Sequence, residues 1–449
     1  MGKQNEFKGK KVLVLGLAKS GHAAAELLHS LGADVVVNDA SPETGNTVAQ
    51  ELRAKGILVI CGGHPDNILD EGFDIIIKNP GIPYHNPVLQ QAEQKGIPIW
   101  TEIELSYLVS EAPIIAITGS NGKTTTTTLL YHILNIAGKK PLIAGNIGTV
   151  ACTVAQNAEP DEVIVMEVSS FQLAGTESFC PKIAVWTNLY DAHLDYHGTS
   201  EEYALAKAKV TANQTEEDFF IYNADQPEMQ PYVNRSAARK IPFSLRGKQA
   251  EGISVDDELI YWQGEPFVKR SIIKLLGRHN LENILAATAS AILMDCDKET
   301  IENVLSSFTG VRHRMQFVKE LKGRTFYNDS KATNALATKS ALSSFDSPVV
   351  LLAGGLDRGH SFEELRPHMS RVKAVLALGE TADRLIDFAA SCGIEHAVKV
   401  DTMEEAVQEA FAVSLEGDQI LLSPACASWD QYPNFEERGD AFIEAVMNL

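Results

Sequence analysis

The segment GSNGKTT, at residues 119–125, has the composition of a loop that holds the phosphates of a nucleoside triphosphate. An apolar run precedes it and a Thr- and Leu-rich stretch follows it, so we expect it to join a strand to a helix. Its glycines let backbone N–H groups approach phosphate oxygens, and the helix N-terminus adds about half a positive charge. Lys123 can reach the β- and γ-phosphates, and the Thr124 hydroxyl can bind Mg²⁺. Because Ile117 replaces the first Gly of the usual motif, a chance Gly-Lys-Thr turn is the alternative.

A carboxylate, an imidazole and an amine follow at positions where they could gather around the triphosphate. Glu167 lies at the end of one predicted strand and His193 follows the next. Lys207 and Lys209 lie on a predicted helix at 203–210. Since Mg²⁺ prefers oxygen ligands, Glu167 is the better ligand and His193 the less usual one. Each residue alone is more typical of a structural role, and only the joint placement after successive strands indicates a site.

Three loops of the C-terminal third mix small, hydroxyl-bearing and charged residues beside predicted strands. They are NDSKATN (328–334), GGLDRG (354–359) and SPACASWDQYPNFEERG (423–439). Lys331 and Arg358 are good carboxylate binders. Asp329 and Asp357 could orient them or contact ATP. Helix caps and turns are the alternative for all three loops, and the patch GVRHR (310–314) is either part of a site or a solvated charge run.

The N-terminal segment GLAKSG (16–21) resembles a dinucleotide-binding turn with one departure. Ala18 replaces the middle glycine, which admits a pyrophosphate closest to the backbone. Asp39 lies near the place of a ribose-binding carboxylate. A nucleotide or nucleotide-sugar site, a structural strand–helix turn and a nicotinamide site all stay open.

The elements that position these residues form three α/β units in series, because β-branched runs alternate with amphipathic stretches. We expect a Rossmann-like domain at 1–100, a central P-loop ATPase-like domain at 101–309 and a C-terminal Rossmann-like domain at 310–449. In such sheets ligands bind outside the carboxyl ends of the strands. The clearest predicted strands are 11–15, 34–37, 75–78, 113–118, 162–166, 183–186, 349–353, 374–378 and 419–422, and a predicted helix covers 279–293.

Composition narrows the class of protein. The chain has 449 residues and a formal net charge of −20, which disfavours a broad nucleic-acid surface. Six cysteines lie far apart without a CxxC pair, which indicates a reducing compartment. The N-terminus lacks the apolar core of a signal peptide, and no apolar run approaches the ~20 residues of a membrane span. We therefore expect a cytoplasmic protein without membrane insertion.

Nine segments, in this order, resemble the Mur ligases. They are ITGSNGKTT (117–125), GNIG (145–148), MEVSSFQL (166–173), TNLYDAHLDYHGT (187–199), YALAK (203–207), GRHNLEN (277–283), HR (313–314), NDSKATN (328–334) and SPACASWDQ (423–431). Together they extend over nearly the whole chain. NDSKATN, SSFQL and SPACASWDQ resemble the D-glutamate-adding branch of the family. The resemblance implies a monomeric enzyme of peptidoglycan synthesis whose partners are UDP-N-acetylmuramoyl-L-alanine, D-glutamate and ATP with Mg²⁺.

The resemblance also implies roles for particular residues. Catalytic positions are Lys123, Glu167, His193 and Lys207. Metal positions, for two Mg²⁺ ions, are Thr124, Glu167, His193 and Lys207, with Glu167 and His193 at the second ion and Lys207 as a carbamylated lysine in preference to Lys209. ATP positions are Gly119, Ser120, Asn121, Gly122, Lys123, Thr124, Thr125, Asn283, Arg314 and Asp329. Substrate positions are Asn146, Lys331, Thr333, Arg358, Ser428 and Phe435, with Gly16, Ser20 and Asp39 for the uridine nucleotide.

The implied chemistry is activation of a carboxylate by ATP as an acyl phosphate, followed by attack of an amine. The C-terminal domain would close over the ATP with the incoming amino acid and exclude water. The alternatives are a sibling Mur or folylpolyglutamate-type ligase, a nicotinamide-dependent dehydrogenase built on GLAKSG, and a non-catalytic nucleotide switch. The dehydrogenase alternative leaves the phosphate loop without a role, and the nucleotide-switch alternative leaves the C-terminal loops without one.

Overall fold

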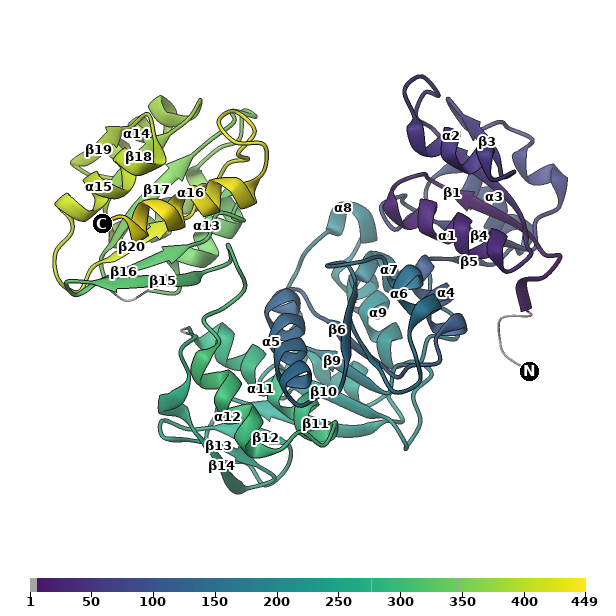
Figure 1. Ribbon diagram of the computed structural model, residues 1–449, viewed down its shortest axis with the longest axis horizontal. Helices are drawn as coiled ribbons and strands as arrows, with labels where there is room; N and C mark the ends of the chain where they lie inside the picture. The colour runs from purple at the N-terminus through teal and green to yellow at the C-terminus, as the bar shows by residue number, and fades with distance from the viewer. Residues whose placement is uncertain (1–5, 276, 346) are drawn as a thin grey trace. The chain divides into compact units, whose positions relative to one another are not determined.

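The computed structural model describes residues 6–275, 277–345 and 347–449. In this part of the chain three α/β domains follow one another, each built on one sheet (Figure 1). The predicted fold class is therefore confirmed. By its internal contacts the chain divides into two compact units. They are Met1–Ile273 with His279–Ser306, and Lys274–Arg278 with Ser307–Leu449. The first unit contains the first two sheets and the second unit the third, while the boundaries at 100 and 309 stay predictions.

The N-terminal domain has a five-stranded parallel sheet in the order β3-β2-β1-β4-β5. Its strands are β1 (Lys11–Leu15), β2 (Asp34–Asp39), β3 (Leu58–Cys61), β4 (Ile75–Lys78) and β5 (Ile99–Trp100), and its helices are α1 (Lys19–Ser30), α2 (Thr47–Ala54) and α3 (Pro87–Lys95). Along β1, Val12 and Val14 belong to one apolar cluster, and Leu13 and Leu15 to another. Both faces of the sheet are thus buried, which explains its continuous apolar strands.

The central domain has a nine-stranded sheet in the order β14-β13-β12-β11-β10-β9-β6-β8-β7. Its strands are β6 (Ile114–Thr118), β7 (Pro141–Gly145), β8 (Val163–Glu167), β9 (Ile183–Trp186), β10 (Phe219–Asn223), β11 (Arg239–Ser244), β12 (Ile253–Val255), β13 (Leu259–Trp262) and β14 (Glu265–Lys269). Its helices are α4 (Glu102–Val109), α5 (Lys123–Ile136), α6 (Ala151–Asn157), α7 (Ser170–Ala174), α8 (Leu194–His197), α9 (Ser200–Ala208), α10 (Gln230–Val233), α11 (Arg278–Leu293) and α12 (Lys298–Ser307). Strands β6 to β12 pair in parallel, and β12, β13 and β14 form an antiparallel edge.

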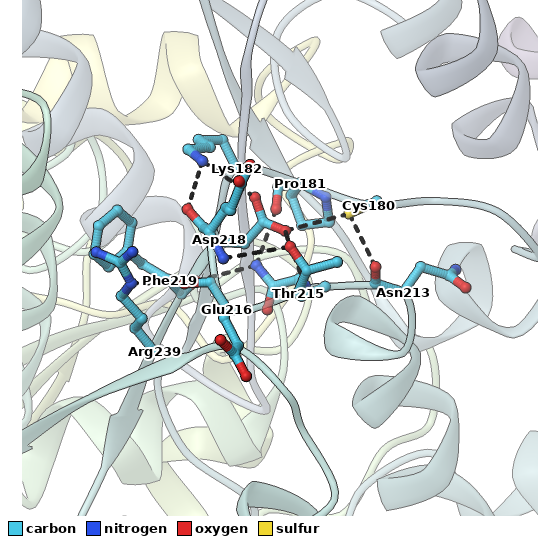
Figure 2. Close-up of polar contacts among 11 residues, drawn as sticks. Cys180, Pro181, Lys182, Asn213, Thr215, Glu216, Asp218, Phe219 and Arg239 are labelled. Atoms are coloured by element: carbon cyan, nitrogen blue, oxygen red, sulfur yellow. Dashed lines mark hydrogen bonds and ion pairs between the residues drawn. The ribbon is translucent and has the colours of Figure 1, made fainter.

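A polar network fixes the amino ends of β9 and β10 (Figure 2). Asp218, just before β10, accepts hydrogen bonds from the Thr215 amide at 2.9 Å and from the Thr215 hydroxyl at 3.1 Å. The same carboxylate forms an ion pair of 3.4 Å with Lys182, just before β9. The thiol of Cys180 donates to the Asn213 carbonyl at 3.3 Å. This network holds the ends of the strands that are opposite to the phosphate loop, so its role is structural.

The C-terminal domain has a six-stranded sheet in the order β15-β16-β20-β17-β18-β19. Its strands are β15 (Gln316–Leu321), β16 (Arg324–Asn328), β17 (Val349–Gly354), β18 (Val372–Leu378), β19 (His396–Lys399) and β20 (Gln419–Leu422), and its helices are α13 (Ala335–Leu342), α14 (Ala382–Ser391), α15 (Met403–Val413) and α16 (Phe435–Met447). All pairs are parallel except β15 with β16. Leu351 and Leu352 of β17 belong to clusters on opposite faces, so this sheet too is covered on both sides.

The predicted strands at 11–15, 75–78, 183–186 and 419–422 match β1, β4, β9 and β20 to the residue. The predicted helix at 203–210 begins earlier, at Ser200, because the Thr199 hydroxyl accepts a hydrogen bond from the Glu202 amide and caps it. It ends in a 3₁₀ turn at Lys209–Thr211. Among the described residues, no helix combines the length and the apolar character needed to cross a bilayer.

Candidate functional site

The phosphate-loop segment joins the end of β6 to the start of α5, as its composition predicts. Gly119 has φ +147° and Gly122 has φ +81°, conformations that L side chains rarely adopt. A Cβ on Gly119 would overlap the Thr187 hydroxyl, and a Cβ on Gly122 would overlap the side-chain amide of Asn283. Asn283 lies on α11, so the structure places this predicted ATP residue directly against the loop. The first amides of α5 have no acceptor within the helix and can face phosphate oxygens.

The residues after β9 fix the shape of the loop. The Asn188 side chain accepts a hydrogen bond from the Asn121 amide at 2.8 Å, and the Thr187 hydroxyl donates to the Asn121 carbonyl at 2.6 Å. The Ser120 amide donates to the Asn188 carbonyl at 3.0 Å. The sequence prediction omits Thr187 and Asn188, although they follow a strand in the same segment from which His193 was selected. Thr187 and Asn188 follow a strand that is expected to lie beside the phosphate loop, and this position is the signal that would have identified them.

Lys123 and Lys207 converge on one backbone oxygen of the loop. The Nζ atoms of both lysines donate to the Gly119 carbonyl at 2.8 Å. Lys207 is 1% exposed, and its Nζ lies 4.7 Å from the centroid of the Tyr203 ring. Burial lowers the pKa of Lys207 well below its ordinary value, the charge of Lys123 lowers it further, and the charge of Glu167 opposes both. The structure thus brings three of the four predicted catalytic residues together.

Glu167 ends β8 and is 2% exposed. Its Oε1 accepts a hydrogen bond of 2.7 Å from the Asn146 side chain, and its backbone carbonyl accepts one of 2.9 Å from the Asn146 amide. Gly145 permits this approach, since a Cβ there would overlap the Glu167 carbonyl oxygen. The predicted substrate residue Asn146 therefore also orients the predicted metal ligand Glu167.

His193 directly precedes α8 and is exposed, with φ +55°. Its ring centroid lies 4.9 Å from that of Phe171 on α7. The Phe171 ring also stacks on His197 at 5.3 Å and meets Tyr196 edge-on at 4.4 Å. Since α7 begins three residues after Glu167, this aromatic cluster ties the His193 segment to the turn that follows the carboxylate.

Several polar atoms around the loop fit a cation and phosphate oxygens. Glu167 Oε2, Asn283 Oδ1 and Thr118 Oγ1 are buried and have no hydrogen-bond partner within the described residues. Buried polar groups are normally paired, so a ligand that supplies partners fits this place. No group of three or more His, Cys, Asp and Glu is arranged for a metal in the part of the chain that the structure describes. The predicted ligands Thr124 and Lys207 are of other residue types, so the predicted set is compatible with that observation.

The N-terminal turn after β1 holds the residues predicted for the uridine nucleotide. Gly16 has φ +94°, and a Cβ there would lie 2.9 Å from Asn79 Cβ. The Asn79 side chain donates to the Ser20 hydroxyl at 3.0 Å. The Asp39 carboxylate accepts the Leu17 amide at 2.6 Å and the Ser41 amide at 2.7 Å. Burial alone would raise the pKa of Asp39, but these amides hold it below its ordinary value, so this carboxylate fixes the turn.

In the second unit, Asp329 follows β16 and is 7% exposed. Its carboxylate accepts hydrogen bonds from the Ser423 hydroxyl at 3.0 Å and from the Met315 amide at 3.1 Å. Burial raises the pKa of Asp329 to about 7, against the opposing effects of these bonds and of the Arg314 charge. Arg314 itself is exposed. These two predicted ATP residues therefore lie close together within their own unit.

The predicted amino-acid residues lie in loops at the carboxyl ends of the same sheet. Lys331 Nζ lies 5.1 Å from the ring centroid of Phe435, the first residue of α16. The Thr333 amide donates to the Lys331 carbonyl at 2.9 Å. Ser428 is 2% exposed, whereas Arg358 is exposed and lies 4.7 Å over the ring of Trp429. Each of these residues thus comes from one of the three loops predicted to bind a carboxylate or from the start of α16.

Arg438, which the sequence prediction missed, joins these loops. It lies on α16 and is 3% exposed. Its guanidinium donates to the Ser330 hydroxyl at 3.0 Å, to the Cys426 carbonyl at 3.1 Å and to the Gly354 carbonyl at 3.3 Å. Burial lowers the pKa of Arg438 to about 10. Only the three-dimensional contacts identify this residue, because its sequence context, FEERG, reads as an exposed helix start.

Three family models match successive parts of the chain. They are described as the N-terminal domain of MurD-like Mur ligases over residues 10–101, the Mur ligase middle domain over 117–291 and the glutamate ligase domain of Mur ligases over 313–426. Together the matches extend over most of the chain.

Full-length relatives and solved structures are also similar to the chain. UDP-N-acetylmuramoylalanine–D-glutamate ligases of Bacillus mycoides and Geobacillus kaustophilus are each 55% identical over 444 residues, with 99% of this chain covered and 99% and 98% of the relatives. The UDP-N-acetylmuramate–alanine ligase of Thermotoga maritima has a TM-score of 0.56 at 19% identity, covering 98% of this chain and 99% of that one. The MurF ligase of Thermotoga maritima in complex with ADP has a TM-score of 0.57 at 17% identity, covering 99% of this chain and 97% of that one. These two structures share the fold.

Proposed function

Since the chain belongs to the Mur ligase family, we propose that it joins D-glutamate to UDP-N-acetylmuramoyl-L-alanine, with conversion of ATP to ADP and phosphate, in peptidoglycan synthesis. The observation that carries this proposal is the 55% identity, over 99% of both chains, to the UDP-N-acetylmuramoylalanine–D-glutamate ligase of Bacillus mycoides. The protein is expected to act in the cytoplasm as a monomer.

A carboxylate is a poor acylating agent, so the reaction first has to convert it into an acyl phosphate, which is a good one. A carboxylate oxygen of the UDP-linked substrate attacks the γ-phosphorus of ATP, and ADP leaves. The amine nitrogen of D-glutamate then attacks the carbonyl carbon of the acyl phosphate, loses a proton, and phosphate departs. Because water would hydrolyse the acyl phosphate, the residues must hold amine and acyl group together in a dry site.

The first unit supplies the groups for phosphoryl transfer. The loop amides of 119–125 and the ammonium of Lys123 face negative charge on the transferred phosphoryl group. The Thr124 hydroxyl would hold one Mg²⁺, and Glu167 and His193 would hold a second; the Oε2 atom of Glu167, which has no hydrogen-bond partner, supports the second assignment. Bound Mg²⁺ supplies a Lewis acid that neutralises phosphate charge. Asn146 orients Glu167 through its 2.7 Å hydrogen bond and binds the substrate beside it.

Lys207 serves as a carbamate. A buried ammonium beside Lys123 cannot also bind Mg²⁺, whereas a carbamate offers the oxygen atoms that Mg²⁺ prefers. The neutral Nζ attacks the carbon of CO₂ and releases one proton, which leaves one negative charge on the new group. Burial favours the neutral amine that reacts in this way.

The second unit supplies the amino-acid pocket. Lys331 and Arg358 bind the carboxylates of D-glutamate, with Thr333, Ser428 and Phe435 around them. Arg314 and Asp329 contact the nucleotide. In the N-terminal domain, the turn at Gly16–Gly21, with Ser20 and Asp39, receives the uridine nucleotide through its backbone, because the Asp39 oxygens already accept two amides.

One assay tests the proposal. Phosphate release from ATP is measured with UDP-N-acetylmuramoyl-L-alanine and, in turn, D-glutamate, L-glutamate and a panel of other amino acids, and the product is identified by mass spectrometry. We expect release only with D-glutamate and a product heavier than the UDP substrate by one glutamyl residue. Equal activity with another amino acid would instead identify a sibling ligase.

A further inference from the structure

Lys78, the last residue of β4, is 1% exposed although it is a lysine. Its Nζ lies within hydrogen-bond distance of the carbonyl oxygens of Ile82 at 2.9 Å, Pro80 at 3.1 Å and Asn79 at 3.3 Å, so its three N–H donors are shared among these oxygens and one further contact. The ammonium therefore sits inside the turn NPGIP (79–83) and holds it from within. Neither this turn nor Lys78 has a role in the proposed mechanism.

The environment of the ammonium is unusual for a charge. Within the described residues, no carboxylate forms an ion pair with Lys78; its surroundings are carbonyls and the rings of Tyr84 and Tyr196, whose centroids lie 5.0 and 5.7 Å from Nζ. Burial lowers the pKa of Lys78 to about 7. A buried lysine without a carboxylate partner lowers the stability of the folded protein. Its hydrogen bonds therefore have to fix the positions of the groups around it.

The fourth contact of Lys78 leads out of the N-terminal domain. Its Nζ lies 3.0 Å from the hydroxyl of Tyr196, which belongs to α8 of the central domain. The Tyr196 hydroxyl, having accepted from Lys78, can donate to the carbonyl of Pro80 at 3.1 Å or of Ile82 at 3.2 Å. The Tyr196 hydroxyl is thus bound both by the ammonium of Lys78 and by the carbonyl oxygens of the turn at 79–83.

The two partners of this contact, Tyr196 and the turn at 79–83, each pack against a part of the proposed site. Tyr196 is three residues after His193 and packs edge-on against Phe171, which also contacts the His193 ring. On the other side, the Asn79 amide donates to the Leu15 carbonyl at 2.8 Å and the Asn79 side chain to Ser20 at 3.0 Å. The turn therefore packs on the glycine turn proposed for the uridine nucleotide.

We propose that Lys78 is a positioning residue, which fixes the orientation of His193 toward Mg²⁺ through the Tyr196 hydroxyl and couples this metal ligand to the nucleotide turn. This inference rests on the proposed function, because it takes His193 as a metal ligand. A lysine suits the role, since its three N–H donors radiate from one atom on a flexible stem and can meet oxygens that do not lie in one plane, whereas the donors of Arg lie in a fixed planar fork.

The sharpest test is the substitution Tyr196→Phe, which removes the hydroxyl and keeps the ring on Phe171. Lys78→Met removes all donors and serves as a second variant. Tyr84→Phe is the matched control, because Tyr84 contacts Lys78 through its ring. Manganese binding to each protein with a non-hydrolysable ATP analogue is followed by electron paramagnetic resonance, and the fold is checked by thermal unfolding.

We expect wild-type protein and the Tyr84→Phe control to bind two Mn²⁺ ions per chain. Tyr196→Phe should weaken the second ion about ten-fold, as loss of an outer partner of a metal ligand typically does. In turnover, the same variant should need more Mg²⁺ for half-maximal rate, with the KM for ATP unchanged at saturating metal. A purely structural role would lower the thermal midpoint without this selective loss of metal.

The outcomes separate the two proposals. If wild-type protein binds two ions and Tyr196→Phe binds both as tightly, the positioning role of Lys78 is wrong while the proposed function stands. If wild-type protein binds only one ion, the assignment of His193 is wrong, and the inference falls with it.

Discussion

Lys207 and Lys209 are two positions apart on the same helical segment, yet their amines have different surroundings. Lys207 Nζ donates to the carbonyl of Gly119 in the phosphate loop. Lys209 Nζ donates to the carbonyls of Ala174 at 2.6 Å and Thr176 at 3.1 Å, just after α7. Lys207 lies in the last turn of α9 and Lys209 begins the 3₁₀ turn that follows, and a step of two residues turns the chain by more than half a revolution, so the two side chains point to different sides. The first can take part in chemistry, and the second fastens the helix.

A pair of alanine substitutions tests this distinction. Lys207→Ala should lower kcat by about 10² or more, because the carbamate proposed to hold Mg²⁺ beside the transferred phosphoryl group is lost. A short carboxylic acid in the medium should restore part of the rate by filling the anion position. Lys209→Ala should keep most of the activity and lose about 1–2 kcal/mol of unfolding free energy with its two hydrogen bonds. Steady-state kinetics and urea denaturation measure both effects, and an essential Lys209 with a dispensable Lys207 would contradict the assignment.

The sequence selects individual site residues well where the chemistry of the side chain itself is the signal. Side-chain chemistry predicts Lys123 and Glu167, the family resemblance adds Lys207 and Asn283, and the structure places all four around one loop. Arg438 could not be predicted in either way, because its place in the structure depends on one hydroxyl and two carbonyls from loops that are far apart in the sequence.

At the scale of elements, Gly119 determines the shape of the strand-to-helix turn between β6 and α5. Gly119 is in a backbone conformation strained for L side chains, and its Cα faces Thr187 and Asn188. Gly138, just after α5, also has a positive φ of 71°, but a Cβ there would meet open space. The two positions separate the effect of backbone strain from that of crowding in the loop.

Gly119→Ala should therefore weaken ATP binding strongly and cost more than the about 1–3 kcal/mol of backbone strain alone, because the loop must also move away from Thr187. Gly138→Ala should cost about 1 kcal/mol of stability and leave ATP binding unchanged. Calorimetric titration with a non-hydrolysable ATP analogue, together with urea denaturation, measures both variants. Equal loss of ATP affinity in the two would show that the loop contact at Gly119 has no special role.

Most long elements could be predicted from the sequence, and the short ones could not. Strands such as β1 and β9 are continuous apolar runs because both faces of their sheets are covered, so their limits are visible in the sequence. The two-residue strand β5 and the edge strand β19 carry no such pattern, since they are short or half exposed. Their places follow from pairing with β4 and β18, which composition does not reveal.

At the scale of the whole molecule, the chain consists of two compact units. Domains with separate cores can unfold separately, and a ligand stabilises only the unit that binds it. We expect two transitions in differential scanning calorimetry. UDP-N-acetylmuramoyl-L-alanine at about 100 times its Kd should add about 2.7 kcal/mol to one unit and move one transition. A single transition that moves as a whole would show that the two units unfold cooperatively.

Strand β20 has a consequence for how the protein is made. It lies between β16 and β17 and pairs with both. In the sheet order of the described residues, β16 and β17 do not pair with each other. The ribosome produces the chain from its N-terminus, so the third sheet lacks its central strand until translation is almost complete. Arg438 emerges later still, on the last helix. A nascent chain can therefore finish its phosphate loop long before the loops proposed to bind the amino acid, and we expect a prematurely terminated chain that lacks these last residues to be inactive.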